Sequence, residues 1–264
     1  MTTRLLHLSD IHFGGEHQAA LAAASDFIRA TPFDLLVISG DLTQYGRDDE
    51  FLAASSWLAG LPGPRLSTPG NHDTPWMGMA ERLSDPFGRY ARAVGPPDAD
   101  AFSAPGLRVR TCNSARGWQI RLNWSKGHIS HAQSRHAARL FRADPVAALR
   151  VMVCHHPLME APGGPMTSRV RGGRAAARRL TEAGVDLVLT GHLHAPFVQS
   201  LPFGDARTYA IGAGTLSVRE RGSPPGFNVI EADAQSVRVR TMAWDGTGLA
   251  SQNEWTVPLR PRLG

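Results

Sequence analysis

The sequence predicts an α/β fold built around a buried parallel sheet. Two short apolar runs, 34–39 and 185–190, each lead directly into a glycine that is followed by Asp41 or by His192. Such runs are typical of strands that are buried on both faces of a parallel sheet. Helical periodicity at 17–30, between the first two strands, adds the βαβ pattern. Because ligands bind at the carboxyl edge of such a sheet, the residues after each strand are the candidates for function.

The other elements are expected from apolar patterns and from Gly and Pro breaks. We expect strands at 4–9, 65–69, 107–112 and 150–154, and helices at 48–58, 76–90, 129–140 and 174–183. Residues 95–106 carry Gly and Pro at both ends and are expected to form a loop. The alternating pattern at 107–112 indicates a half-buried strand, where we expect the sheet to turn antiparallel.

The last part of the chain has a different pattern. Short strand candidates at 208–211, 227–230 and 237–242 are separated by turn signals. We expect a second, mostly antiparallel sheet, which the strands of about 205–264 complete. The 264 residues, 42% of them hydrophobic, are expected to form a single domain (1–264), because the residues with candidate chemistry extend from position 10 to position 194.

Composition argues against several classes of protein. No apolar run approaches the roughly 20 residues that span a bilayer, and the segment before Asp10 lacks the pattern of a secretory signal, so we expect a cytoplasmic protein. The net charge is +5, but the arginines are scattered and Lys126 is the single lysine, so nucleic acid is not an expected partner. Cys112 and Cys154 lie in strand-like runs and are expected to be buried thiols. The sequence leaves open whether the chain forms a homo-oligomer.

Metal-ligating residue types gather at the expected strand ends. They are Asp10, His12, Asp41, Asn71, His72, Asp73, His155, His192 and His194. Residues two apart on an extended strand project to the same side, so Asp10 with His12, and His192 with His194, can each present a pair. Carboxylate, imidazole and amide ligands without thiolate favour Mn, Fe, Co, Ni or Zn in a catalytic site. Two such ions about 3.5–4 Å apart clamp a phosphoryl group and generate hydroxide, so we expect hydrolysis, with Asp41 bridging the ions.

Five short blocks occur in a fixed order: Asp10-Ile11-His12, Gly40-Asp41, Gly70-Asn71-His72-Asp73, His155 and Gly191-His192-Leu193-His194. In residue type, order and completeness, these blocks resemble the signature of the calcineurin-like metallophosphoesterases. The resemblance covers about residues 4–215. The fold it implies is α/β, a four-layer α/β/β/α sandwich of two mixed sheets flanked by helices, with the dimetal site at the carboxyl ends of the strands.

The resemblance also implies a role for each matching residue. One metal ion is expected on Asp10, His12, Asp41 and His194, and the second on Asp41, Asn71, His155 and His192. The expected ions are Mn²⁺ and/or Fe, with Zn²⁺, Co²⁺ and Ni²⁺ as alternatives. His72 would stabilise the phosphate or protonate the leaving alkoxide, and Asp73 would orient His72. His156 is the alternative to His155, which we favour because the family's ligand directly follows the apolar strand.

The expected activity is the hydrolysis of a small phosphodiester by a metal-bridging hydroxide. Within the family, the Asp-x-His and His-His-Pro blocks and the compact size look most like bacterial cyclic-nucleotide and glycerophosphodiester phosphodiesterases. The alternatives are a phosphomonoesterase, a lipid-linked pyrophosphate hydrolase, a nuclease, and a catalytically silent scaffold of the same fold. The retention of His72 beside intact ligands argues against a scaffold. Arg169 and Arg171, in a Gly-rich loop between two ligand blocks, are the candidates for binding an anionic substrate.

Overall fold

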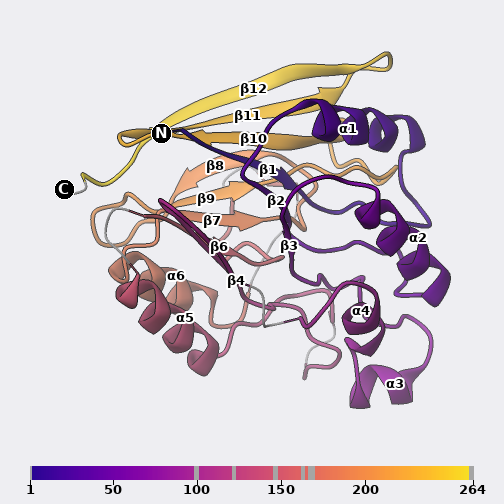
Figure 1. Ribbon diagram of the computed structural model, residues 1–264. Helices are drawn as coiled ribbons and strands as arrows, with labels where there is room; N and C mark the ends of the chain where they lie inside the picture. Colours follow the sequence, from indigo (N-terminus) through magenta and orange to yellow (C-terminus); the bar gives the residue numbers. More distant parts are fainter. Residues whose placement is uncertain are drawn as a thin grey trace.

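The computed structural model describes residues 2–97, 101–120, 123–144, 148–161, 164–165 and 170–261. Within these residues, two six-stranded sheets pack face to face, and helices cover the outer face of each sheet (Figure 1). The α/β/β/α layering expected from the sequence is therefore confirmed.

The first sheet joins the two ends of the described chain. Its strand order is β12-β11-β10-β1-β2-β3. The strands are β1 (Thr3–Leu8), β2 (Leu35–Ile38), β3 (Arg65–Ser67), β10 (Gly226–Ala232), β11 (Ser236–Trp244) and β12 (Leu249–Pro258). β1, β2 and β3 run parallel, whereas β10 pairs antiparallel with β1 and continues into the antiparallel strands β11 and β12. The carboxyl ends of β1, β2 and β3 therefore meet at one edge.

The second sheet has the order β4-β5-β6-β7-β9-β8. The strands are β4 (Ala101–Ala104), β5 (Leu107–Thr111), β6 (Leu149–Val153), β7 (Leu187–Thr190), β8 (Phe197–Ser200) and β9 (Tyr209–Gly212). β5, β6, β7 and β9 are parallel, and β4 and β8 are antiparallel strands at its two edges. Both sheets are thus mixed.

Alternation along the strands builds three apolar layers. In β1, Leu5 belongs to the cluster between the two sheets, while Leu6 and Leu8 point to the opposite face and pack with α1 and α2. The helices are α1 (Gln18–Ala30), α2 (Asp48–Ala59), α3 (Met79–Ser84), α4 (Gly88–Ala93), α5 (His131–Ala143) and α6 (Gly173–Glu182). α5 and α6 pack together and cover the outer face of the second sheet. Figure 1 shows α1 and α2 on one side of the molecule and α5 and α6 on the other.

Four sequence-based expectations are corrected. The strands after 205 do not complete a separate sheet, because β9 enters the second sheet while β10, β11 and β12 pair outward from β1 in the first. Residues 101–104, expected in a loop, form β4 against β5. The antiparallel pairing expected at 107–112 occurs on one side of β5 only, because this strand pairs antiparallel with β4 but parallel with β6. The helix expected at 76–90 is divided into α3 and α4, because Pro86 and the residue before it disfavour continuous helix.

The expected burial of the two cysteines is confirmed. Cys112 and Cys154 are buried free thiols. His7, on β1, is fully buried, and its Nε2 lies 2.9 Å from Ser39 Oγ. In the part of the chain that the structure describes, no helix is both long and apolar enough to cross a bilayer. That residues 1–264 form a single domain stays a prediction.

Candidate metal centre

The candidate ligands all lie in loops that follow parallel strands. Asp10 and His12 follow β1, Asp41 follows β2, Asn71 follows β3, and the histidines of the last two blocks follow β6 and β7. Because the two sheets pack face to face with these carboxyl ends at the same side, five segments far apart in the sequence supply one cluster.

The backbone is left-handed at most of these positions. Six described non-glycine residues have a positive φ, and five of them are candidate ligands: Asp10 (53°), His12 (54°), Asp41 (53°), His192 (68°) and His194 (58°). We expected Asp10 and His12 to project from an extended strand, but β1 ends at Leu8 and both residues have turned out of it. Left-handed backbone is strained for residues other than glycine, and its concentration at one site is typical of functional sites.

The first group of ligand atoms comes from both sheets. His194 Nε2 lies 3.1 Å from Asp10 Oδ1, and His12 Nε2 lies 3.8 Å from the same oxygen. The two imidazole Nε2 atoms of His12 and His194 are 3.3 Å apart. Asp10 and His12 are fully buried, and His194 is almost so. Three potential ligand atoms therefore converge on one point within the apolar interior.

Asp41 lies between this group and a second one. Its Oδ2 is 3.9 Å from His12 Nε2 and 3.2 Å from His155 Nε2. The His192 ring follows, with its centroid 5.3 Å from that of His155. Asn71, which precedes His72 in the loop after β3, has a buried Oδ1 without a hydrogen-bond partner. Asp41 is thus the central carboxylate of the cluster.

Backbone carbonyls fix the protons of three of the imidazoles. Nδ1 of His12 lies 3.2 Å from Thr43 O, Nδ1 of His155 lies 2.8 Å from Ser39 O, and Nδ1 of His194 lies 2.6 Å from Arg219 O. A carbonyl oxygen only accepts, so each Nδ1 donates its proton and each neutral ring turns its Nε2 lone pair toward the cluster. This arrangement is the one that metal-ligating histidines adopt.

The lone pairs of the ligand nitrogens therefore face those of the ligand oxygens unless a cation lies between them. Asp10 Oδ1, Asn71 Oδ1, His155 Nε2 and His192 Nε2 are all buried without a hydrogen-bond donor. Burial lowers the pKa of His155, but the charge and hydrogen bond of Asp41, the charge of Asp10 and the Ser39 carbonyl together outweigh it and raise this pKa to about 9, so a proton fills the place when no metal ion does. Hard carboxylate and amide oxygens with borderline imidazole nitrogens suit divalent transition metals, and the residues present fit such ions.

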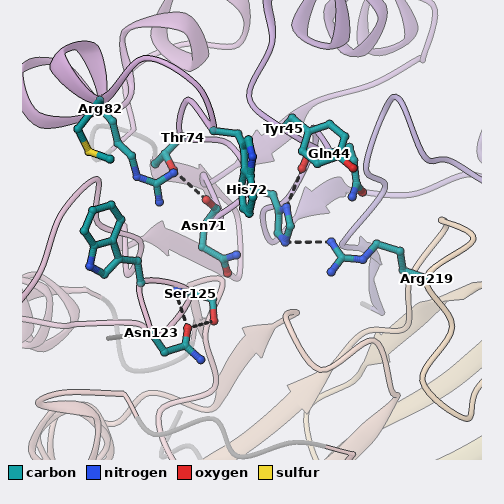
Figure 2. Close-up of a pocket in the computed structure, with 12 residues that line it drawn as sticks. Gln44, Tyr45, Asn71, His72, Thr74, Arg82, Asn123, Ser125 and Arg219 are labelled. Carbon is teal, nitrogen blue, oxygen red and sulfur yellow. Dashed lines mark hydrogen bonds between the residues drawn. The ribbon is translucent and has the colours of Figure 1, made fainter. Parts of the chain in front are cut away.

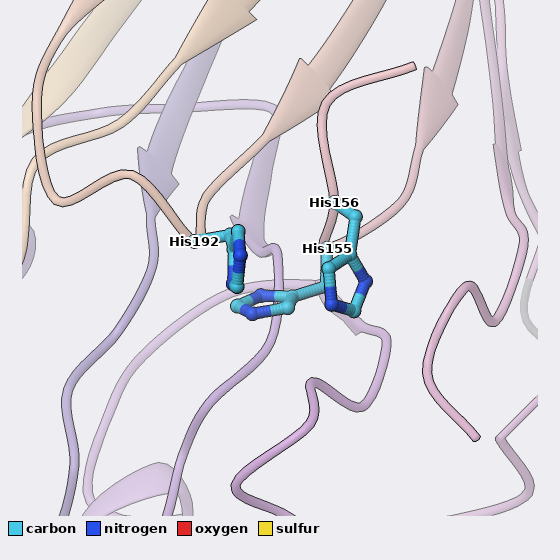
Figure 3. Close-up of side chains that lie close together, drawn as sticks. All are labelled: His155, His156 and His192. Carbon is cyan, nitrogen blue, oxygen red and sulfur yellow. The ribbon is translucent and has the colours of Figure 1, made fainter. Parts of the chain in front are cut away.

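The hydrogen bonds distinguish His155 from His156. The His156 ring lies beside both other histidines (Figure 3), with its centroid 4.5 Å from that of His192. However, its Nδ1 lies 2.8 Å from Ser114 Oγ and its Nε2 lies 2.8 Å from Ser125 O. Both nitrogens of His156 have protein partners, whereas His155 keeps a free Nε2. The geometry favours His155 over His156, and the assignment of His155 as a ligand stays a prediction.

His72 stands at the edge of the cluster, and its partner is not the expected one. We expected Asp73 to orient it, but His72 Nδ1 lies 2.7 Å from the carbonyl oxygen of Gln44. On the other side of the ring, Arg219 Nη1 lies 3.0 Å from Nε2. The His72 ring also makes an edge contact with His12, with centroids 4.7 Å apart. His72 is therefore held by a backbone carbonyl and capped by a guanidinium.

Asp73 instead ties together the loops after β2 and β3. Its carboxylate accepts hydrogen bonds from the backbone N–H groups of Leu42, Thr43 and Gly70 at 3.2, 2.9 and 2.8 Å, and from Thr43 Oγ1 at 2.9 Å. Burial, with the nearby charge of Asp41, raises the pKa of Asp73 to about 7. The correction has a simple cause: these donors, three backbone N–H groups and the Thr43 hydroxyl, belong to loops that only the fold brings together.

Close approach of the backbone requires glycine at two points in the cluster. A Cβ atom at Gly70 would overlap Asp41 Oδ1, and a Cβ atom at Gly191 would overlap Ser9 Oγ and Asp10 Oδ2. The Asp10 carboxylate also accepts a 2.9 Å hydrogen bond from the backbone N–H of His192. These glycines let the loops of the two sheets meet at the carboxylates.

A cavity of about 1030 Å³ opens beside His72 and Asn71. Figure 2 shows these two side chains between Arg219 on one side and Arg82 on the other, with Gln44 beside His72. Sequence reasoning missed Arg219, which follows β9 and lies beyond the segment that carries the five blocks. The signal that could have found it is an Arg-x-Arg pattern, Arg219 and Arg221, in a loop rich in Gly, Ser and Pro.

The two arginines expected to bind the substrate are Arg169 and Arg171, of which the structure describes only Arg171. Arg169 lies outside the described residues. Arg171 is exposed, its backbone N–H donates to Gly127 O at 3.0 Å, and its side chain does not line the cavity beside His72. A substrate contact from either residue stays a prediction.

A comparison with protein families identifies the family to which the chain belongs. A family model described as "Calcineurin-like phosphoesterase" matches residues 3–196, which is more than half of the chain. The chain belongs to the calcineurin-like phosphoesterase family. The resemblance noted in the sequence is confirmed, and the five blocks all lie inside the matched segment.

Two curated relatives of this phosphoesterase are phosphodiesterases by name. This chain is 28% identical to a probable cyclic nucleotide phosphodiesterase of Synechococcus sp. over 218 residues, which are 75% of this chain and 76% of the relative. It is 33% identical over 81 residues, 26% of this chain and 29% of the relative, to the glycerophosphodiester phosphodiesterase GpdQ of Enterobacter lignolyticus. Among solved structures, the purple acid phosphatase PPD1 from yellow lupin (Lupinus luteus) seeds has a TM-score of 0.65 at 12% identity, covering 98% of this chain and 54% of that one, which is a likeness of fold.

The family and the His/Asp cluster together indicate a binuclear divalent metal site in this phosphoesterase. The choice of Mn²⁺ and Fe among the divalent ions stays a prediction.

Asp73 provides a test of how the loops are held. In Asp73→Asn, an amide N–H group would face the backbone donors, so we expect the free energy of unfolding to fall by about 3 kcal/mol in urea titrations. Asp26→Asn, which changes an exposed carboxylate on α1, should alter it by less than about 0.5 kcal/mol. Equal effects of the two substitutions would contradict the structural role of Asp73.

Proposed function

We propose that this chain is a two-metal phosphodiesterase that hydrolyses a small phosphodiester of the cyclic nucleotide or glycerophosphodiester type. The observation that carries the proposal is a pair of carboxylate oxygens, Asp10 Oδ1 and Asp41 Oδ2, that face imidazole Nε2 atoms at 3.1 and 3.2 Å. Each pair needs a cation, and both lie beside a cavity that ends at His72. The names of the two curated relatives support a diester as the substrate.

The proposed ligands divide into two sets around Asp41. Asp10, His12 and His194 would hold the first ion together with Asp41, and Asn71, His155 and His192 would hold the second with it. Two ions in such a site clamp the phosphoryl oxygens and lower the pKa of a water molecule that becomes the nucleophile. The protein supplies the fixed Nε2 lone pairs, the buried carboxylates and the exclusion of bulk water.

His72 and Arg219 supply the other half of the reaction. In the proposed step, the water oxygen would form a bond to phosphorus and give up one proton as the ester P–O bond breaks. His72, protonated at Nε2 when the Arg219 guanidinium binds the phosphate instead, would deliver that proton to the departing oxygen, and the proton released by the water would restore it. The Gln44 carbonyl fixes the ring by accepting from Nδ1. The Arg219 guanidinium, 3.0 Å from His72 Nε2, is placed to bind a non-bridging phosphate oxygen at the same end of the cavity.

The cavity supports a diester over a monoester. A monoester phosphate leaves no second substituent, whereas the cavity extends from His72 and Asn71 to Trp124. Its volume of about 1030 Å³ is that of a site for a whole metabolite and not for a phosphate group alone. A phosphomonoesterase, a lipid-linked pyrophosphate hydrolase and a silent scaffold are the alternatives that the assay separates. A cytoplasmic location and a homo-oligomer stay predictions.

The function is tested on the purified protein in two steps. Metal analysis should find about two transition-metal ions per chain, and Mn²⁺-supplemented protein should hydrolyse bis-p-nitrophenyl phosphate faster than p-nitrophenyl phosphate. A faster monoester reaction would replace the diesterase proposal by the monoesterase one. Absence of both metal and turnover would leave the scaffold alternative.

His72 can be tested apart from metal binding. In His72→Ala, kcat should fall by roughly 10²–10⁴ while the metal content stays unchanged, because the residue acts on the leaving group and is not a ligand. His136→Ala, which changes an exposed histidine on α5, is the matched control and should keep kcat. Loss of metal in His72→Ala would mean that this residue belongs among the ligands.

Metal content should follow the ligand assignment. Asp41→Ala should lose both ions, because its carboxylate serves both sets, whereas Asn71→Ala and His155→Ala should keep about one. His156→Ala should keep both, since its ring nitrogens are used by Ser114 and Ser125. The metal-to-protein ratio, measured by plasma mass spectrometry on folded protein, gives the answer. Two ions retained in Asp41→Ala would rule out a bridging role.

A further inference from the structure

The cavity beside His72 is lined by aromatic rings. Tyr45 and Trp76 line it with 42% and 65% of their surfaces exposed, and their ring centroids are 6.0 Å apart. Large aromatic side chains left this open are unusual for a surface without a partner. They belong to the loops after β2 and β3, which also carry Asp41 and Asn71. Exposed aromatic rings therefore line the same cavity as His72 and Asn71.

Trp124 lines the same cavity, and Arg82 holds its ring. The Arg82 guanidinium lies 5.4 Å from the Trp124 ring centroid, in cation–π contact. It is 9% exposed, and it donates from Nε to Gly117 O at 2.8 Å and from Nη1 to Pro75 O at 3.0 Å. Within the described residues it has no ion pair with a carboxylate, and burial alone lowers its pKa. Other N–H groups of this buried cation are left for acceptors in the cavity.

The two arginines mark two ends of one binding site. Figure 2 shows Arg219 and Arg82 on opposite sides of Asn71 and His72. Arg219 stands beside His72 and the metal ligands, where the phosphoryl group would be bound. Arg82 stands beside Trp124, where the second part of the substrate would be bound. A ligand that fills the site needs an anionic group at one end and a flat group with hydrogen-bond acceptors at the other.

We propose that the part of the cavity lined by Trp76 and Arg82 is a nucleobase subsite, in which the base stacks on Trp76 and accepts hydrogen bonds from Arg82. This inference rests on the proposed phosphodiesterase function and selects the cyclic nucleotide class within it. A nucleobase has both a π-face for stacking and ring nitrogens or carbonyls for a guanidinium. A glycerol group has no face to stack, and a choline group would be repelled by the Arg82 charge.

The subsite is tested by substrate selectivity. We compare kcat/KM of the metal-loaded enzyme for 3′,5′-cyclic AMP and for glycerophosphoethanolamine, which has no ring. In Trp76→Ala, the ratio of the two values should fall about tenfold or more, mainly through a higher KM for the nucleotide. Trp76→Phe, which keeps a ring, should restore most of the ratio. Met77→Ala, at the neighbouring exposed position that does not line the cavity, should leave the ratio unchanged.

Binding of a product provides a readout that does not depend on turnover. Calorimetry of the metal-loaded protein should show that Trp76→Ala weakens 5′-AMP about tenfold and changes the affinity for glycerol 3-phosphate less than twofold. Equal weakening of both ligands, or an unchanged selectivity ratio, would overturn the subsite even if both diesters are hydrolysed. If neither diester is hydrolysed but 5′-AMP binding still depends on Trp76, the proposed function fails and the subsite stands.

Discussion

The centre depends on imidazole nitrogens that face carboxylate oxygens without a proton between them. In His155 and His194 the proton is held at Nδ1 by a backbone carbonyl, so Nε2 meets Asp41 and Asp10 with its lone pair. In water such contacts would be tolerated, but these atoms are buried, and repulsion between them is relieved by a metal cation or, at His155, by a second proton on the ring. The layers of apolar side chains that exclude water are therefore part of the metal site. Binding of a cation removes the electrostatic repulsion between these buried atoms.

The second requirement is that loops from two sheets reach the same point. Parallel strands end at one edge, but a side chain on a strand points to one face or the other and not beyond the end. The left-handed backbone at Asp10, Asp41 and His192 turns each chain immediately after its strand, so that the side chains point across the gap. Glycine at positions 70 and 191 lets the opposing backbone approach the carboxylates. Strained backbone and closely packed glycines thus allow side chains from two sheet edges to converge on one site.

Much of this arrangement could be predicted from residue order. The apolar runs before Asp41 and His192 identified buried strands, and the five blocks identified the cluster that the structure brings together. The predicted reason for the pairing of Asp10 with His12 was wrong, because backbone turns and not strand alternation orient them. The partners of His72 and Asp73 could not be predicted, since they are backbone groups and Arg219, whose positions depend on tertiary structure. β12 escaped prediction because most of its side chains are exposed and the apolar alternation that packs on the core, Trp255 and Val257, is confined to its last residues.

The antiparallel pairing of β1 with β10 has a consequence for biosynthesis. Leu5 pairs with Ile230 and His7 with Asn228, so the strand that leads into Asp10 gains this neighbour only after β10 has been synthesised, more than 200 residues later. Every candidate ligand has been translated by His194, yet the carbonyl that orients this histidine belongs to Arg219. Pairings this distant in sequence form late in folding. The set of ligands with its orienting carbonyls is therefore complete only after residues well beyond His194 have been synthesised and have folded.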